Sequence, residues 1–131
     1  MNLADGVTFK GIHSSTFHLS ILETERPILP ETKDTYIEIP HRDGSLLIPD
    51  DSKRDLTVRI LFALIPPPDA NLYEEARNVG NWLHSTKREP LIFDDDPTFI
   101  YNAKVVGNIP LERIVHHGRF WVDFRCSPNS L

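Results

Sequence analysis

Residues 36–49 read Tyr-Ile-Glu-Ile-Pro-His-Arg-Asp-Gly-Ser-Leu-Leu-Ile-Pro, and no other segment says as much about the architecture. Two runs that favour β-structure, Tyr36–Ile39 and Leu46–Ile48, flank Asp43-Gly44, the commonest signal for a two-residue hairpin turn. Pro40 and Pro49 cannot donate hydrogen bonds to a sheet, which confines these strands to a sheet edge or to an arm outside the main sheet. The sequence therefore predicts a protruding β-hairpin arm at about residues 35–50.

The open edges of such an arm need a partner, because unpaired sheet edges promote aggregation. We expect the arm to cross a subunit boundary and to complete the sheet of an identical neighbour, the strand-addition mode of recognition. Head-to-tail contacts of this kind close into rings when the rotation per subunit permits. The candidate interface residues come from both strands and the turn: Tyr36, Ile37, Ile39, Pro40, His41, Arg42, Asp43, Gly44, Leu46, Leu47 and Ile48.

The composition predicts a single domain, residues 1–131, in a reducing compartment. The chain has a formal net charge of −5 and 40% hydrophobic residues, and its length is enough for one hydrophobic core. Its only cysteine, Cys126, excludes an internal disulfide framework and a multi-cysteine zinc site. No apolar run approaches the ~20 residues of a membrane helix and no secretory leader is recognisable, so we expect no membrane association. The acidic balance and scattered basic residues argue against a basic nucleic-acid-binding face.

Alternation of apolar and polar residues predicts a mainly β protein with one helix (α+β). Leu56–Leu64 alternates most strictly, and we expect this strand at the centre of the sheet. His13–Ser15 is typical of a turn, and Glu23–Thr35 of an extended loop that leads into the arm. The other expected strands are Val7–Phe9, Phe17–Leu22, Leu91–Phe93, Phe99–Val106, Ile109–Leu111 and Phe120–Phe124.

One helix is predicted at about residues 72–84. Asn71 is a suitable N-cap, and Glu74 three residues later completes a capping-box pattern. An apolar face at helical spacing, flanked by Trp82, is expected to pack on the sheet. The residues of this face are Leu72, Ala76, Val79 and Leu83.

Several residues suggest chemistry, but none of them forms a convincing active site. Asp94–Asp96 could supply oxygen ligands to a divalent cation, and His116 and His117 could bind a metal with Glu112. Neighbouring residues of a strand point to opposite faces, so charged turns are the simpler interpretation. His41, Arg42 and Asp43 serve a tight turn more readily than acid–base catalysis, and Cys126 is expected to be a buried, inert thiol. Ser14-Ser15 lacks the nucleophile-elbow pattern, and we expect no enzyme, metal or cofactor.

Motifs along nearly the whole chain occur in an order that resembles a known family. They are Phe9–Ser15, Tyr36–Gly44, the helix end Trp82-Leu83, Leu91–Pro97, Tyr101–Val105 and Leu111-Glu112. In this order they are similar to the N-terminal domain of distal tail proteins of long-tailed phages with non-contractile tails. The resemblance implies a β-sandwich with one helix and a protruding hairpin. Many relatives carry a second, galectin-like domain, and we expect no second domain in this sequence.

The resemblance also implies a structural role in the virion tail, after assembly in the cytoplasm of the host bacterium. Six copies would form a ring that joins the tail tube to the baseplate or adsorption apparatus. The implied partners are a second copy of the chain, the tail tube protein, the tape-measure protein and the baseplate hub or tail-fibre protein. DNA would pass through the channel of the ring without specific binding.

Two other classes of function remain open from the sequence. A monomeric binding module, for example for carbohydrate, could use an exposed Trp82 or Trp121 as a stacking platform. A small metal-dependent hydrolase could use Asp94–Asp96 with His116 or His117.

Overall fold

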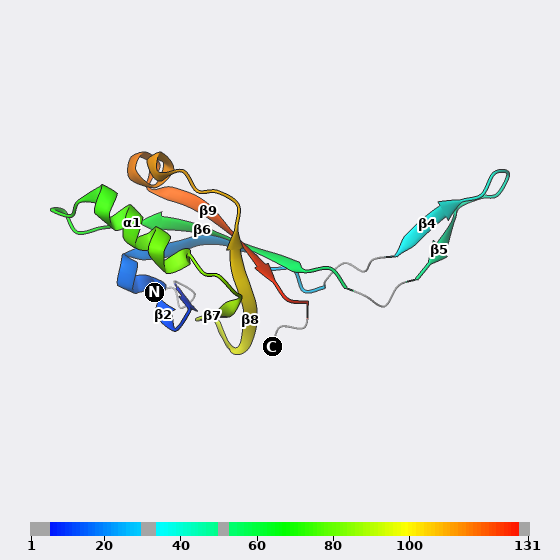
Figure 1. The fold of residues 1–131 in the computed structure, drawn as a ribbon, viewed down its shortest axis with the longest axis horizontal. Helices are drawn as coiled ribbons and strands as arrows, with labels where there is room; N and C mark the ends of the chain where they lie inside the picture. Colours follow the sequence, from blue (N-terminus) through cyan, green and yellow to red (C-terminus); the bar gives the residue numbers. More distant parts are fainter. Residues whose placement is uncertain (1–5, 30–33, 50–52, 129–131) are drawn as a thin grey trace.

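The computed structural model describes residues 6–29, 34–49 and 53–128, and it divides them into a body and an arm (Figure 1). Nine strands, one α-helix and two short helical turns make up this part of the chain. The strands are β1 (Val7–Phe9), β2 (Ile12–His13), β3 (Leu19–Glu25), β4 (Thr35–Glu38), β5 (Ser45–Ile48), β6 (Leu56–Leu64), β7 (Glu89–Phe93), β8 (Asp96–Val106) and β9 (Arg119–Cys126). The helical elements are a 3-10 turn (Ser14–Phe17), α1 (Leu72–Leu83) and a π-helical turn (Arg113–His117).

The body is a curled, antiparallel seven-stranded sheet in the order β2-β1-β7-β8-β9-β6-β3. The long strand β8 pairs with β7 along its first part, and from Ala103 to Val106 it pairs with β9, so it belongs to both halves of the sheet. The two halves face each other across the core, because the rings of Phe9 in β1 and Phe124 in β9 are in edge contact at 5.2 Å between centroids. This architecture confirms the predicted mainly β, sandwich-like fold with one helix.

Strand β6 has the alternation that its sequence predicts. Leu56, Val58, Ile60 and Phe62 are buried, and the strand is paired on both sides, with β9 and with β3. Its expected position at the centre of the sheet is wrong, because β3 alone lies outside it and β6 is therefore next to one edge.

Helix α1 packs on the body through its C-terminal half. The side chain of Asn71 accepts hydrogen bonds from the backbone N–H groups of Tyr73 and Glu74 (3.1 and 3.3 Å), as the capping pattern predicts. Trp82 is buried and donates its indole N–H to the carbonyl of Phe9 (3.0 Å). Leu72 is wrongly predicted as part of the buried face: it is 38% exposed, because it is the first helical residue and precedes the turns that cover the sheet. The other buried residues of the face are Ala76, Val79 and Leu83.

Two other predictions of local structure are wrong. Phe17 belongs to the 3-10 turn instead of a strand, and β3 runs from Leu19 to Glu25, into the predicted loop, with a bulge between Ile21 and Glu23. Ile109 and Leu111 are not in a strand but pack against the core beside the π-helical turn, which Gly118 ends at a φ of 68°. Two or three apolar residues in a short run fit the two-residue period of a strand and the 3.6-residue period of a helix equally well, which explains both errors. Among the described residues, no helix has the length and apolar character to cross a membrane.

Candidate functional site

The predicted arm is a separate two-stranded sheet made of β4 and β5. Its register places Tyr36 opposite Leu47 and Ile37 opposite Leu46. Figure 1 shows the arm at one end of the long axis of the molecule and α1 at the other. Every residue of both strands is exposed. The arm therefore receives no cover from the body.

Both faces of the arm carry large apolar side chains. Ile37, Leu46 and Ile48 share one face and are 42%, 40% and 44% exposed. Tyr36 and Leu47 lie on the other face and are 67% and 46% exposed. A hairpin with two apolar faces and no third strand is marginally stable by itself in water, so this geometry favours a partner.

The turn of the arm is longer than predicted and spans residues 39–44 between β4 and β5. The ladder stops at Glu38, because Pro40 has no N–H to continue it. The N–H of Arg42 donates to the carbonyl of Ile39 (3.2 Å), and His41 has a φ of 66°, as in a type II turn with proline in its second position. Gly44 also has a positive φ, 78°. The prediction of a two-residue turn at Asp43-Gly44 is therefore wrong.

The two tryptophans do not provide a stacking platform for a sugar. Trp82 is only 3% exposed and belongs to the core. Trp121 is half-buried, and the guanidinium of Arg59 lies 4.5 Å from the centre of its ring. The prediction of an exposed tryptophan face is wrong for Trp82, and at Trp121 the ring face is shared with Arg59.

The three consecutive aspartates do not converge on one point. Asp94 accepts a hydrogen bond from Nε2 of His13 (2.8 Å), whereas Asp95 accepts two from the guanidinium of Arg26 (2.9 and 2.8 Å). The hydrogen bonds from Arg26 lower the pKa of Asp95 below its usual value, and Asp95 in turn raises the pKa of Arg26. Asp96 begins β8. Within the ranges that the structure describes, no three His, Cys, Asp or Glu side chains gather as metal ligands.

The other candidate groups for chemistry are also apart from one another. His116 and His117 are exposed in the π-helical turn, and Glu112 precedes it. Cys126 is buried, and burial raises the pKa of its thiol to about 12. Ser14 is buried and accepts a hydrogen bond from the N–H of Val7 (3.2 Å), which is a structural role.

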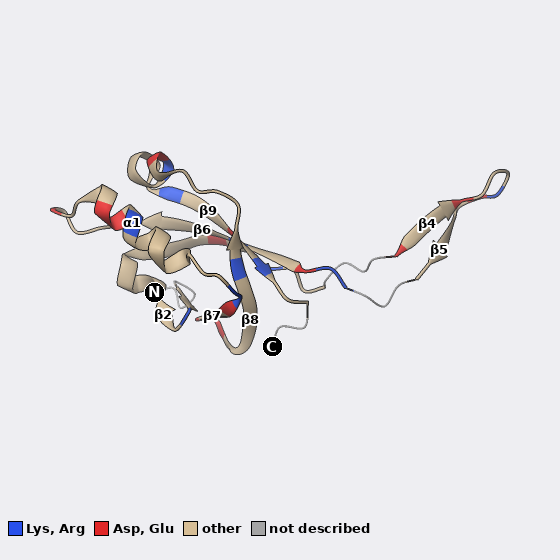
Figure 2. Cartoon of the chain, in the orientation of Figure 1, with Lys and Arg blue, Asp and Glu red and all other residues tan. Residues whose placement is uncertain are grey.

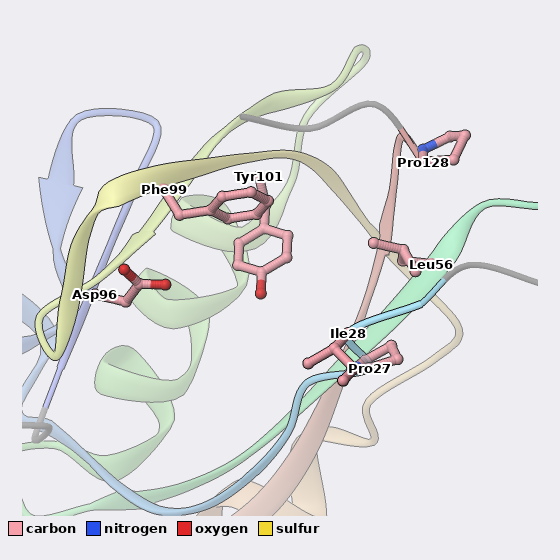
Figure 3. A pocket seen from close by; sticks show the side chains of 7 residues that line it. All are labelled: Pro27, Ile28, Leu56, Asp96, Phe99, Tyr101 and Pro128. Carbon is pink, nitrogen blue, oxygen red and sulfur yellow. The ribbon is translucent and has the colours of Figure 1, made fainter.

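A hollow of about 360 Å³ lies at the side of β8, and sequence reasoning missed it. Figure 3 shows Phe99 and Tyr101 side by side, with the phenol of Tyr101 pointing towards Pro27 and Ile28. Ile28 is 93% exposed and its neighbour Leu29 is 77% exposed. The one sequence signal was this aliphatic pair in an otherwise polar segment. The hollow is lined by Pro27, Ile28, Leu56, Asp96, Phe99, Tyr101 and Pro128.

Two comparisons with known proteins, one by family and one by fold, agree on the class of protein. The family model described as the phage tail protein RIFT-related domain matches residues 12–126. The crystal structure of the Dit protein of phage SPP1, described as a paradigm of the hub adsorption apparatus in phages that infect Gram-positive bacteria, is similar with a TM-score of 0.75. The sequence identity is 16%, and the similarity covers 94% of this chain but 50% of that chain.

A curated relative has a different description. Nucleolar protein 6 of Xenopus laevis is 27% identical over 105 residues, which cover 76% of this chain. The similar segment is only 9% of that much longer protein. The family match covers most of this chain and agrees with the similarity in fold. The chain belongs to the family of phage tail proteins with a RIFT-related domain, and it has the fold of a siphophage distal tail protein.

Proposed function

We propose that six copies of this chain form a ring at the distal end of a phage tail, and that the arm makes much of the contact between neighbours. The ring joins the tail tube to the baseplate or adsorption apparatus. Its other partners are the tube protein, the tape-measure protein and a hub or tail-fibre protein, and it assembles in the cytoplasm of the host bacterium. Residues 1–131 act as one domain of the N-terminal type. The membership in a phage tail family and the likeness in fold to the SPP1 protein support this proposal.

The observation that carries the proposal is the uncovered arm. Its strands present Tyr36, Ile37, Leu46, Leu47 and Ile48 to solvent, each at least 40% exposed. Contiguous apolar surface of this kind marks an interaction site. An arm that extends away from its own body is suited to reach a neighbour, and six identical contacts of the head-to-tail type close a ring.

The charge of the chain suits passage of DNA through such a ring. The formal net charge is −5, and Figure 2 shows acidic and basic segments interspersed along the ribbon. DNA phosphates bind to proteins mainly through clustered Lys and Arg side chains, so an acidic ring is expected to bind the DNA backbone only weakly. The channel therefore lets DNA pass without specific binding.

The experiment is a comparison of masses in solution by light scattering. The variant with Ile37→Ser, Leu46→Ser and Ile48→Ser removes one apolar face of the arm but leaves the body unchanged. The wild type is expected to have the mass of an oligomer, and the variant that of a single chain. Ile65→Ser is the matched control, because Ile65 is a large exposed aliphatic residue of the body (64% exposed). Equal masses of the wild type and the arm variant would contradict the proposal.

The two alternative functions have less support. A sugar-binding platform at Trp82 would need the indole to leave the core, where it donates hydrogen bonds to Phe9 and Ile12. A hydrolase built on Asp94 and Asp95 would need both carboxylates to leave their partners His13 and Arg26. A structural role requires neither change.

A further inference from the structure

The hollow at the side of β8 combines apolar walls with one carboxylate. Leu56 and Phe99 contribute apolar surface, Tyr101 lies between them, and Asp96 is at one end (Figure 3). Ile28 lines the hollow, and Leu29 follows it in the sequence; with exposures of 93% and 77% they are the most exposed large hydrophobic residues among those described. Aliphatic side chains this exposed indicate a surface that a partner covers.

Asp96 differs from the two aspartates before it. Asp94 is paired with His13 and Asp95 with Arg26. The backbone of Asp96 pairs with Phe93, but its carboxylate makes no hydrogen bond or salt bridge within residues 6–29, 34–49 and 53–128; its charge adds to the field that raises the pKa of Arg26. Its carboxylate is exposed at the end of a hollow that the apolar side chains Ile28, Leu56 and Phe99 line together with Tyr101. A cationic group at the tip of an apolar segment is the complement of such a site.

The turn of the arm has this complementary chemistry. Arg42 is exposed at the turn and has no ion pair in the described part of the chain. Ile39, three residues before it, is 37% exposed. The guanidinium of arginine presents a planar set of donors that matches a carboxylate. The arm therefore carries one available cation next to apolar side chains, and the hollow carries one available carboxylate next to apolar walls.

We propose that the hollow receives the arm turn of a second copy of this chain, with Arg42 against Asp96 and the apolar side chains of the arm over Ile28 and Leu29. This inference rests on the proposed function, in which the arm reaches a neighbour, and it adds the place where the arm docks. It needs no change in the body, because the hollow already exists.

Another hollow of the body is less suitable for the arm. It is lined by Lys53, Arg54, Asp55 and Arg125. Asp55 there already accepts hydrogen bonds from Arg88 and Arg125 (2.9 and 3.0 Å). This polar hollow offers no aliphatic wall to the arm, and its carboxylate already has partners.

Charge reversal tests the docking site. Arg42→Glu places two carboxylates in contact at the interface, and Asp96→Arg places two cations there, so each single variant is expected to lose the oligomer that the wild type forms. The double variant, with both changes in one chain, is expected to regain it. Light scattering at one protein concentration and low salt measures all four masses, because salt screens exposed charge pairs.

Mixing the two single variants separates contacts between chains from contacts within a chain. If the arm docks on another copy, an equal mixture can alternate around the ring, and every junction then pairs opposite charges. The mixture is therefore expected to regain the oligomer although neither variant forms it alone. Docking of each arm on its own body would leave the mixture monomeric and would overturn the proposal.

The controls use charges and side chains away from the hollow. Asp69→Arg and Arg113→Glu reverse exposed charges elsewhere and are expected to leave the mass unchanged. Circular dichroism and thermal melting check that each variant is folded. Ile28→Ser tests the apolar part of the site independently of the charges, and it is expected to weaken the oligomer without a change in melting temperature, because Ile28 is 93% exposed.

The possible results show whether the proposed docking site alone is wrong or the proposed ring as well. A wild type that is monomeric at every concentration overturns both. An oligomer that the arm-face variant disrupts, but that Arg42→Glu and Asp96→Arg leave intact, overturns the docking site alone and leaves the ring in place. Loss of the oligomer in both single variants without recovery in the double variant or the mixture also overturns the docking site.

Discussion

At the scale of single residues, Arg26 and Asp95 fasten the edge of the sheet to its opposite half. Arg26 follows the edge strand β3, and Asp95 lies in the turn between β7 and β8. The guanidinium makes two hydrogen bonds to the carboxylate and lies 4.3 Å from the centre of the ring of Phe93. The side chains are 27% and 32% exposed, so this pair is partly protected from water. This contact links the end of β3 to the turn between β7 and β8, and so it connects the two halves of the sheet on the side where the sheet is open.

Asp95→Asn is expected to lower the free energy of unfolding at pH 7 by about 1 kcal/mol. The pKa of Asp95 is lower in the folded state than its usual 3.8, so its contribution is complete above that pH and is lost as the pH falls through the folded value. The difference between wild type and variant is therefore expected to shrink as the pH falls from 5 to 2. Urea unfolding at a series of pH values measures it, with Asp69→Asn as control, because Asp69 is exposed and away from Arg26. A difference that stays constant with pH would contradict the role of this pair.

Cys126 is expected to be unreactive in the native protein. It is fully buried, and its pKa is raised to about 12, so almost no thiolate exists at pH 8. A colorimetric thiol reagent should label the single cysteine of the chain only after unfolding in urea. Rapid labelling of the folded protein would place Cys126 at the surface and would contradict the packing of β9 on β6.

At the scale of secondary structure, α1 and β6 follow from the sequence because their patterns are long. Twelve helical residues and nine strand residues allow several repeats of each period. Ile109 and Leu111 offer only one repeat, which fits a strand and a helical turn equally well. The start of β3 at Leu19 depends on the 3-10 turn before it. That turn could not be predicted, because its residues show no apolar periodicity. The length of the arm turn depends on Pro40, whose missing N–H ends the ladder before the Asp43-Gly44 signal.

One part of the candidate site could be predicted from the sequence, and the other could not. The arm could be predicted because its prolines and β-branched residues are adjacent in sequence. The hollow could not, because Ile28, Leu56 and Phe99 come from three distant segments that only the folded sheet brings together. The pairing of Asp94 with His13 and of Asp95 with Arg26 was hidden for the same reason.

Asn71→Ala is expected to lower the free energy of unfolding by about 1 kcal/mol. The change removes the oxygen that accepts hydrogen bonds from the N–H groups of Tyr73 and Glu74. Chemical unfolding followed by circular dichroism measures the loss. Asn78→Ala is a matched control, because Asn78 is exposed within α1 and alanine has the higher helix propensity. Equal effects of the two substitutions would show that Asn71 does not cap the helix.

Hydrogen exchange is expected to report the partner of the arm. A two-stranded hairpin gives little protection by itself, so the amides of β4 and β5 should exchange rapidly in a dilute single subunit and slowly in the oligomer. The amides of β6, which pair on both sides, should be protected in both states. Arm amides that exchange at the same rate before and after assembly would show that the arm stays uncovered.

At the scale of the whole molecule, the body and the arm have separate tasks. The body buries one core of aromatic and aliphatic side chains, with Trp82 in contact with Phe9, Phe17 and Phe62. The arm has no buried residue in either strand. This contrast between a packed body and an uncovered apolar arm supports the proposal that the arm contacts another copy of the chain.

Electron microscopy of the purified protein in negative stain shows directly whether the arm holds a ring together. We expect rings with sixfold symmetry and a central channel for the wild type, and single small particles for the variant with Ile37→Ser, Leu46→Ser and Ile48→Ser. Lone particles in the wild type at every concentration, or identical rings from the arm variant, would contradict this expectation.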